Sequence, residues 1–348
     1  MPIGSISYLF TPDCRRQGAD EVGSPGYRVT FLDFFSVDVT PEKPDRYMND
    51  EDGHDSTKLE ELQQRIQHAD ASNLPKQLSR TGEILDDSMM RRWLHGRSVE
   101  TTIEDLKEHA AWRQDFVGTS HHGIPEETIR PLLAANIIFL QGNDDHGYPI
   151  LVFVARNYDA GQFSSLIPYL MAYAIDGALL CADGKLNPKK QIKWIFDLSN
   201  VSRKNVSVEF LEKIFSLLQN HYPECLSHLY FLNSSFLFRA IWSCAVAFIS
   251  TETRQKISFM SNNGLECELR DIFGKSLPTH YGGDAPWRPV EASIRVIRKG
   301  GTLQNTQFRD IDVTDDKTQV PRFSLRSIKF WLVFLLALIY LLGKLYFF

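Results

Sequence analysis

Apolar and polar residues follow two different periods along the middle of the chain. Residues 149–155 and 191–198 are strand-like apolar runs, whereas residues 166–180 and 208–218 repeat apolar positions at helical spacing. This alternation of strand and helix predicts an α/β fold with a mostly parallel sheet and helices packed on it. The same pattern continues with two short strands and an apolar helix, at 228–232, 257–260 and 236–248.

The flanking regions have other patterns. Residues 1–56 are rich in Pro, Gly, Asp and Ser and are predicted to be mostly irregular. Residues 57–120 form a small helical region, because N-cap residues at 86–88 precede apolar positions at helical spacing. The α/β domain is predicted at 130–283, and a polar linker at 284–325.

The C-terminal end differs from the rest of the chain, because residues 330–342 are uninterrupted apolar sequence. A helix over 330–348 would rise about 28 Å and match a bilayer, so residues 329–348 are predicted as a transmembrane tail anchor. A buried terminal helix is the alternative, but such a helix usually has a polar stripe. Three basic residues precede the span, which favours a cytosolic N-terminal part. The endoplasmic reticulum is the favoured membrane, and the mitochondrial outer membrane or another organelle is the alternative.

Composition excludes several other functions. The net charge is −5, which gives no general attraction to nucleic acid. The five cysteines are scattered and form no CxxC pair, so neither a disulfide framework nor a zinc site is predicted. The N-terminus carries no apolar run typical of a signal peptide.

The common catalytic motifs are absent from the sequence. It has no GxSxG elbow, no GxGxxG after a strand, no P-loop and no HExxH. The acidic segment Gly142–Gly147 lacks the downstream Glu of a calcium loop, and a β-turn is the better interpretation. His121 and His122 are adjacent, so they point apart and form no metal set. We therefore expect a binding protein without catalytic residues, metal or cofactor.

Seven segments stand in the order found in one lipid-binding family. They are LHGR with Trp112-Arg113, Gly142 to Pro149, Ile195 to Leu198, Leu218 to Glu224, Tyr230 to Asn233, Thr253 to Ile257 and Leu277 to Gly283. Over about residues 85–283 the chain resembles the CRAL-TRIO family, which includes the fungal phosphatidylinositol and phosphatidylcholine transfer proteins. It departs at Tyr148, where Arg is usual, and at Ser234-Ser235, where Ala-Pro is usual.

The resemblance implies a closable apolar pocket for a phospholipid. The strands would supply its floor, and the helix 236–248, here called the gate helix, would roof it and swing aside at a membrane. The alternative is that the apolar residues of this helix belong to an ordinary core. The predicted floor is Val152, Val154, Ile195 and Phe231, and the predicted roof is Phe236, Phe238, Ile241, Trp242, Ala245 and Phe248.

The resemblance also implies a headgroup site. Residues matching the family's inositol-phosphate contacts are Arg97, Glu224, Thr253 and Lys256. The positions that match the choline-headgroup contacts carry Ile192 and Trp194, which have no hydroxyl, so phosphatidylinositol is favoured. Each headgroup residue has a structural alternative: an ion pair for Arg97, a helix-end carboxylate for Glu224 and a solvated charge for Lys256.

Other functions stay open at this point. The pocket could hold a sterol, a tocopherol or a retinoid, or the chain could be a membrane-held adaptor for other proteins. Residues 33–37 (DFFSV) look like the core of short motifs that bind endoplasmic-reticulum receptors, although an ordinary strand is favoured there.

Overall fold

The computed structural model describes residues 52–68, 72–118, 120–260, 265–303 and 306–308. The predicted membrane span at 329–348 and the segment 33–37 lie outside these residues. Within the described part of the chain, no helix is both long enough and apolar enough to cross a membrane.

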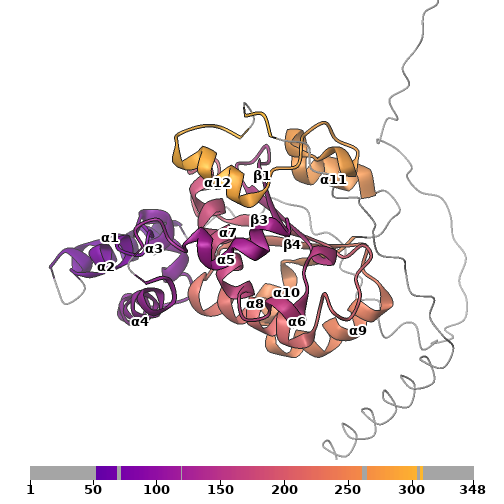
Figure 1. The fold of residues 1–348 in the computed structure, drawn as a ribbon. Helices are drawn as coiled ribbons and strands as arrows, with labels where there is room; N and C mark the ends of the chain where they lie inside the picture. The colour runs from indigo at the N-terminus through magenta and orange to yellow at the C-terminus, as the bar shows by residue number, and fades with distance from the viewer. Residues whose placement is uncertain (1–51, 69–71, 119, 261–264, 304–305, 309–348) are drawn as a thin grey trace, which may run out of the picture. The chain divides into compact units, whose positions relative to one another are not determined.

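Four N-terminal helices enclose an apolar core of their own (Figure 1). Asp86 begins the third helix, because its carboxylate accepts a 2.9 Å hydrogen bond from the Met89 amide. Ser98 begins the fourth helix in the same way, accepting from Thr101. The first helix begins at Asp52, inside the segment predicted to be irregular. The helices are α1 (Asp52–His68), α2 (Leu74–Ser79), α3 (Asp87–Leu94) and α4 (Val99–Val117).

A five-stranded sheet in the order β1-β2-β3-β4-β5 forms the centre of the second part. Strands β2 to β5 run parallel, whereas β1 runs antiparallel to β2. The sheet is therefore mixed, which corrects the prediction of a mostly parallel sheet. The strands are β1 (Ile138–Asn143), β2 (Pro149–Val154), β3 (Ile192–Asp197), β4 (Leu226–Leu232) and β5 (Ile257–Phe259).

A short turn between β1 and β2 causes the antiparallel pairing, because a connection of this length can only join antiparallel neighbours. The Asp144 carboxylate accepts hydrogen bonds from the backbone amides of His146 and Tyr148, at 2.9 and 2.8 Å. Its other oxygen lies 2.5 Å from Lys193 Nζ. The turn predicted for this acidic segment is thus confirmed.

Helices connect the strands and cover one face of the sheet. The apolar helices α7, α8 and α9 pack there, and α10 leads into β5 (Figure 1). These connecting elements are α5 (Glu126–Ala134), η1 (Ala155–Asn157), α6 (Ala160–Phe163), α7 (Ile167–Cys181), α8 (Val208–His221), α9 (Phe236–Ala245), η2 (Val246–Phe248) and α10 (Thr251–Gln255).

The C-terminal elements extend the domain beyond its predicted end. Helix α12 packs on α7 and β1, and its Ile294 is fully buried against Gly177. The predicted linker at 284–325 is therefore corrected over its first part, because the amphipathic helix buries its apolar side on α7. These elements are α11 (Leu265–Phe273), η3 (Gly274–Ser276), η4 (Thr279–Tyr281) and α12 (Val290–Arg298).

The guanidinium of Arg113 on α4 joins the N-terminal helices to the sheet domain. It is completely buried, lies 2.5 Å from Asp176 on α7, and pairs with Glu83 at 3.3 Å. It also donates a 3.0 Å hydrogen bond to the hydroxyl of Tyr222, just after α8, and that hydroxyl donates to Asp176. One cation thus satisfies two carboxylates from different parts of the chain.

Three groups at or beside this junction make its stability depend on pH. Burial by itself would raise the pKa of Glu83, but His109 and Arg113 lower it from 4.5 to about 2, so its contribution to stability is lost as the pH falls between these values. Burial lowers the pKa of His221 from 6.5 to about 4, so protonation of the unfolded chain weakens folding over that range. Burial raises the pKa of Asp176 above its ordinary value. This carboxyl group therefore lowers the stability of the fold as the pH rises, which is the opposite of the effect of Glu83 and His221.

Replacing the buried cation should cost far more stability than replacing an exposed one. Arg113→Met leaves two nearly buried carboxylates without a counter-charge, and we expect the free energy of unfolding to fall by about 3–5 kcal/mol. The control is Arg130→Met, because Arg130 forms only an exposed pair with Glu127. This replacement should lower the free energy of unfolding by less than about 1 kcal/mol. Urea unfolding measures both, and equal midpoints would contradict a structural role for Arg113.

Candidate functional site

Glu224 and Lys256 meet at one end of the sheet. Glu224 lies in the turn before β4 and Lys256 directly precedes β5, and these neighbouring strands are parallel, so their beginnings lie together. Lys256 Nζ is 2.8 Å from Glu224 Oε2, and the two side chains are about one-fifth exposed. The structure thus brings together two of the four predicted headgroup residues.

The turn that carries Glu224 is held firmly. Glu224 has a left-handed backbone with φ of 53°, which is uncommon for a residue with a side chain. Gln191 donates a 3.0 Å hydrogen bond to its carbonyl, and the next carbonyl, of Cys225, accepts from the Ile192 amide. The carboxylate of Glu224 therefore projects from a fixed backbone.

Thr253 lies in the first turn of α10, close in sequence to Lys256. Its hydroxyl oxygen accepts a 2.9 Å hydrogen bond from Ser250, the N-cap residue of this helix. The Thr253 hydroxyl can still donate its own hydrogen to a ligand oxygen.

Arg97 has a different environment from the one the resemblance implies. Its Nε lies 3.1 Å from Asp105, and its Nη1 donates to the carbonyl of Trp93 at 3.0 Å. These contacts hold the guanidinium among α3 and α4, which matches the structural ion pair considered as the alternative. The structure does not bring Arg97 into the pair formed by Glu224 and Lys256.

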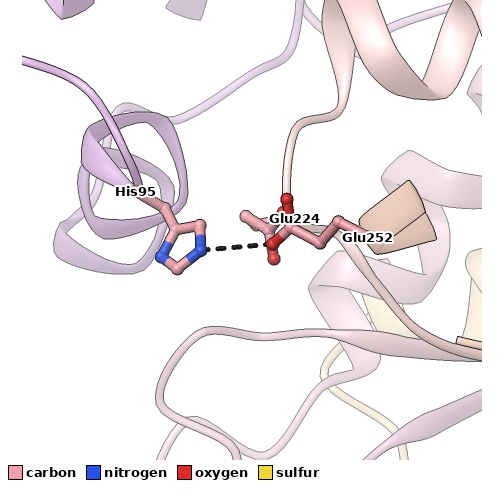
Figure 2. A group of neighbouring side chains, drawn as sticks. All are labelled: His95, Glu224 and Glu252. Atoms are coloured by element: carbon pink, nitrogen blue, oxygen red, sulfur yellow. Dashed lines mark ion pairs between the residues drawn. The ribbon is translucent and has the colours of Figure 1, made fainter. Parts of the chain in front are cut away.

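His95 and Glu252, which were not predicted, reach the same place instead (Figure 2). His95 ends α3, and its Nε2 lies 3.4 Å from Glu252 Oε1 at the start of α10. One ligand atom from each of His95, Glu252 and Glu224 lies within 4.8 Å of the others, a spacing that could hold a metal ion. A cation there would compete with the Lys256 ammonium for Glu224. His95 belongs to the LHGR segment and Glu252 directly precedes Thr253, which is the only signal the sequence offered.

Two lysines lie near His228 at this end of the sheet. Burial lowers the pKa of His228 on β4, and the charges of Lys193 and Lys256 lower it further. The imidazole is therefore neutral at neutral pH, which makes it a poor partner for a phosphate compared with Lys256.

The predicted pocket floor is divided between the two faces of the sheet. Paired positions across the strands show this, because successive residues of a strand point to opposite faces. Val152 pairs with Ile195 in one row, whereas Phe153, Phe196 and Phe231 form the next row. Val152, Val154 and Ile195 therefore lie on the face opposite to Phe231, which corrects the predicted floor.

Only the face with Phe231 is covered by the gate helix. The ring of Phe153 lies 5.5 Å from that of Phe210 on α8, and the ring of Phe231 lies 4.8 Å from that of Phe238 on α9. The opposite face carries Asp197, which pairs with Val154 in the ladder and accepts a 3.0 Å hydrogen bond from Tyr281 of η4. The C-terminal segment thus reaches that face.

The gate helix is amphipathic and closed on the sheet. Phe238 and Ala245 are buried, Ile241 and Trp242 are partly buried, and Phe236 is 83% exposed. The ring of Trp242 lies 5.1 Å from that of Phe231. The side chain of Phe248 lies outside the described residues.

The apolar space beneath these helices is small. A cavity of about 10 Å³ lies between β3, β4 and α8. Ligand pockets usually span about 300–1,000 Å³. The cavity between β3, β4 and α8 is therefore too small for a lipid in this conformation. The lining residues are Trp194, Phe196, Leu211, Ile214, Phe215, Leu218, Leu226, Leu229 and Phe231.

A wider surface groove of about 420 Å³ lies where α4, α7 and α8 meet. Trp112, Phe116 and His221 line it together with Glu209, Glu212 and other residues, and it includes no predicted site residue. Its polar rim makes it less suited to acyl chains than the face beneath α9.

Comparison with known proteins shows what this part of the chain resembles. Residues 133–283, which are less than half of the chain, match the family model described as the CRAL/TRIO domain. The match begins three residues after the start of the predicted α/β domain, at 130, and both end at 283.

The segments aligned with known relatives are longer than residues 133–283. A CRAL-TRIO domain-containing protein of Schizosaccharomyces pombe is 28% identical over 186 residues, which is 50% of this chain and 51% of that protein. The phosphatidylinositol/phosphatidylcholine transfer protein SFH7 of Arabidopsis thaliana is 25% identical over 214 residues, 57% of this chain and 39% of that protein. The chain thus spans about half the length of the curated relatives it matches.

A solved structure shares the fold. The crystal structure of Sfh5 aligns with a TM-score of 0.50 at 14% identity, covering 73% of this chain and 99% of that chain. The alignment extends well beyond 133–283, so the shared fold includes more than these residues.

Buried contacts of Phe238 should control the opening of α9. Phe238→Ala removes the ring that packs on Phe231, and a buried Phe→Ala change costs about 3–5 kcal/mol. We expect amide hydrogen exchange in residues 236–248 to accelerate at least tenfold, while exchange in β3 is much less affected. Phe236→Ala, at an exposed position of the same helix, is the matched control. Equal exchange in the two variants would mean that Phe238 does not hold α9 closed.

Proposed function

We propose that this chain binds a phospholipid between α9 and the sheet and transfers or presents it at a cytosol-facing membrane. The observation that carries this proposal is the Lys256–Glu224 pair at the end of an aromatic sheet face that an amphipathic helix covers. An apolar face accommodates acyl chains, and the charged pair at its end is suited to a polar headgroup. This is a binding function without covalent chemistry.

The energetics require such a pocket. A phospholipid exposes roughly 30 methylenes to water when it leaves a bilayer, at a cost of about 0.8 kcal/mol each. The rings of Phe153, Phe196 and Phe231 would replace the bilayer as the apolar surroundings of these chains. Opening of α9 exposes this row, and membrane contact at Phe236 would favour the opening.

Phosphatidylinositol is the proposed ligand. The Lys256 ammonium would offset the phosphate charge, and Glu224 would accept hydrogen bonds from inositol hydroxyls. Thr253 would donate to a phosphate oxygen. The name of the Arabidopsis relative, a phosphatidylinositol/phosphatidylcholine transfer protein, supports this ligand class.

We further propose that the chain is held at the membrane by residues 329–348, with the endoplasmic reticulum as the favoured location. The support is the uninterrupted apolar sequence at 330–342 and the basic residues that precede it. Residues 133–283 would then act within reach of the membrane that supplies their lipid.

Loss of the Lys256 charge should reduce phosphatidylinositol transfer selectively. We expect Lys256→Ala to slow vesicle-to-vesicle transfer of phosphatidylinositol about tenfold or more, because a charge-assisted hydrogen bond contributes about 1.5–3 kcal/mol. The melting temperature should change little, since the pair is partly exposed. The control is Lys213→Ala, which breaks an exposed pair with Glu209 on α8. Equal transfer by the two variants would refute the headgroup assignment, and mass spectrometry of copurified lipid would then reveal a sterol, tocopherol or retinoid if one is bound instead.

Removal of the apolar tail should release the chain from membranes. A chain ending at residue 325 retains every described helix and strand, so we expect it to fold and to remain in the supernatant after carbonate extraction. The full chain should stay in the membrane pellet. A truncated chain that still resists carbonate would rule out the tail as the anchor.

A further inference from the structure

Three side chains that can bind a metal ion meet beside the sheet, although they come from distant parts of the sequence. His95 ends α3, Glu224 lies in the turn before β4, and Glu252 lies in the first turn of α10 (Figure 2). One ligand atom of each residue lies within 4.8 Å of those of the other two. Two of the three, His95 and Glu252, are not among the residues that the resemblance matched to headgroup contacts.

The contact between His95 and Glu252 has the spacing of two ligands of one ion rather than that of a hydrogen bond. His95 Nε2 lies 3.4 Å from Glu252 Oε1, whereas the pair of His109 and Glu83 in the same protein has a hydrogen-bond distance of 2.8 Å. Ligand atoms about 2.0–2.2 Å from a tetrahedral zinc ion lie about 3.4 Å from each other. The two atoms therefore already stand at the separation that a shared ion requires.

The charges of the cluster also favour a cation. Glu224 and Glu252 bring two carboxylates together, and within the described residues Lys256 is the only lysine or arginine that pairs with either of them. Glu224 has a second oxygen, so it can bind an ion while Oε2 remains near Lys256. The side chain of Glu252 is 58% exposed and can rotate to shorten the remaining distances. A divalent ion would therefore balance both carboxylates.

The types of ligand indicate which ion fits. Zinc binds imidazole nitrogen and carboxylate oxygen, usually with four ligands, whereas calcium and magnesium take oxygen ligands. One histidine and two glutamates provide three of the four positions of a zinc site, and a water molecule can fill the fourth.

We propose that His95, Glu224 and Glu252 bind one Zn²⁺ ion, which ties α10 to the end of α3. Helix α10 begins at Thr251, shortly after the gate helix ends at Phe248, so the ion would restrain the segment that joins the gate helix to β5. This site goes beyond the proposed lipid binding and needs no lipid to form. The sequence motifs predicted no metal site, because the three ligands have no characteristic spacing along the chain.

The test is calorimetric titration of Zn²⁺ into the full chain after treatment with a chelator. We expect one site per chain. Glu252→Gln keeps the size of the side chain and removes its charge, and we expect it to weaken zinc binding at least about tenfold, as should His95→Ala. The control is His121→Ala, which removes an exposed histidine and should bind like the parent. Absence of binding by the parent, or parent-like binding by Glu252→Gln, would overturn the inference.

The variant Lys256→Ala separates this site from the headgroup proposal. It should bind Zn²⁺ several-fold more tightly, because the ammonium no longer competes for Glu224. The same variant is expected to lose phosphatidylinositol transfer, so the two proposals predict opposite effects. Equal or weaker zinc binding by Lys256→Ala would mean that Glu224 is not a ligand. A chain that binds zinc as expected and transfers no lipid would refute the proposed function and leave this inference standing.

Hydrogen exchange in the parent chain tests the tie between α10 and α3. Zn²⁺ should slow amide exchange in residues 251–255 several-fold, since opening of α10 would break the bond to Glu252. Exchange in β2 should not change, and zinc should have no such effect in Glu252→Gln. Zinc binding without slower exchange in α10 would contradict the proposed tie.

Discussion

The buried guanidinium of Arg113 is the constraint on which the arrangement of this protein depends. Glu83, Asp176 and Tyr222 converge on it from three separate parts of the chain. A buried cation is tolerated only when carboxylates and hydrogen-bond acceptors surround it, so these segments must meet there. Tyr222 is two residues from Glu224, and the same contact therefore helps to fix the turn that presents the Glu224 carboxylate.

The junction also explains how the N-terminal helices contribute to the candidate site. Because α4 is tied to α7 and α8, the end of α3 lies beside α10, where His95 meets Glu252. The N-terminal helices thus form one wall of the polar end of the sheet. A chain reduced to residues 133–283 would lack this wall. It would therefore lack His95, the residue that pairs with Glu252.

The gate helix combines two requirements that oppose each other. Phe238 and Ala245 are buried, so closure hides apolar surface, whereas Phe236 leaves an exposed ring at the beginning of α9. In this state the cavity between β3, β4 and α8 is only about 10 Å³.

Local pattern was enough to predict several features of this chain. The alternation of apolar periods predicted helices and strands, and short-range chemistry predicted the cap at Asp86 and the turn at Asp144, because these depend on neighbouring residues. The resemblance named Glu224 and Lys256 as headgroup residues, but only the structure showed that they form an ion pair. Helix α12 was missed because its polar surroundings resembled a linker.

The sequence could not determine which face of the sheet forms the pocket. All six residues of β2 are buried, so the strand is apolar throughout and its alternation carries no information about which side faces α9. Only the register across the strands separated Val152 from Phe231, and only tertiary packing brought His95 to Glu252 and left Arg97 with Asp105. Contacts between distant segments are set by the packing of whole elements, and no local pattern records them.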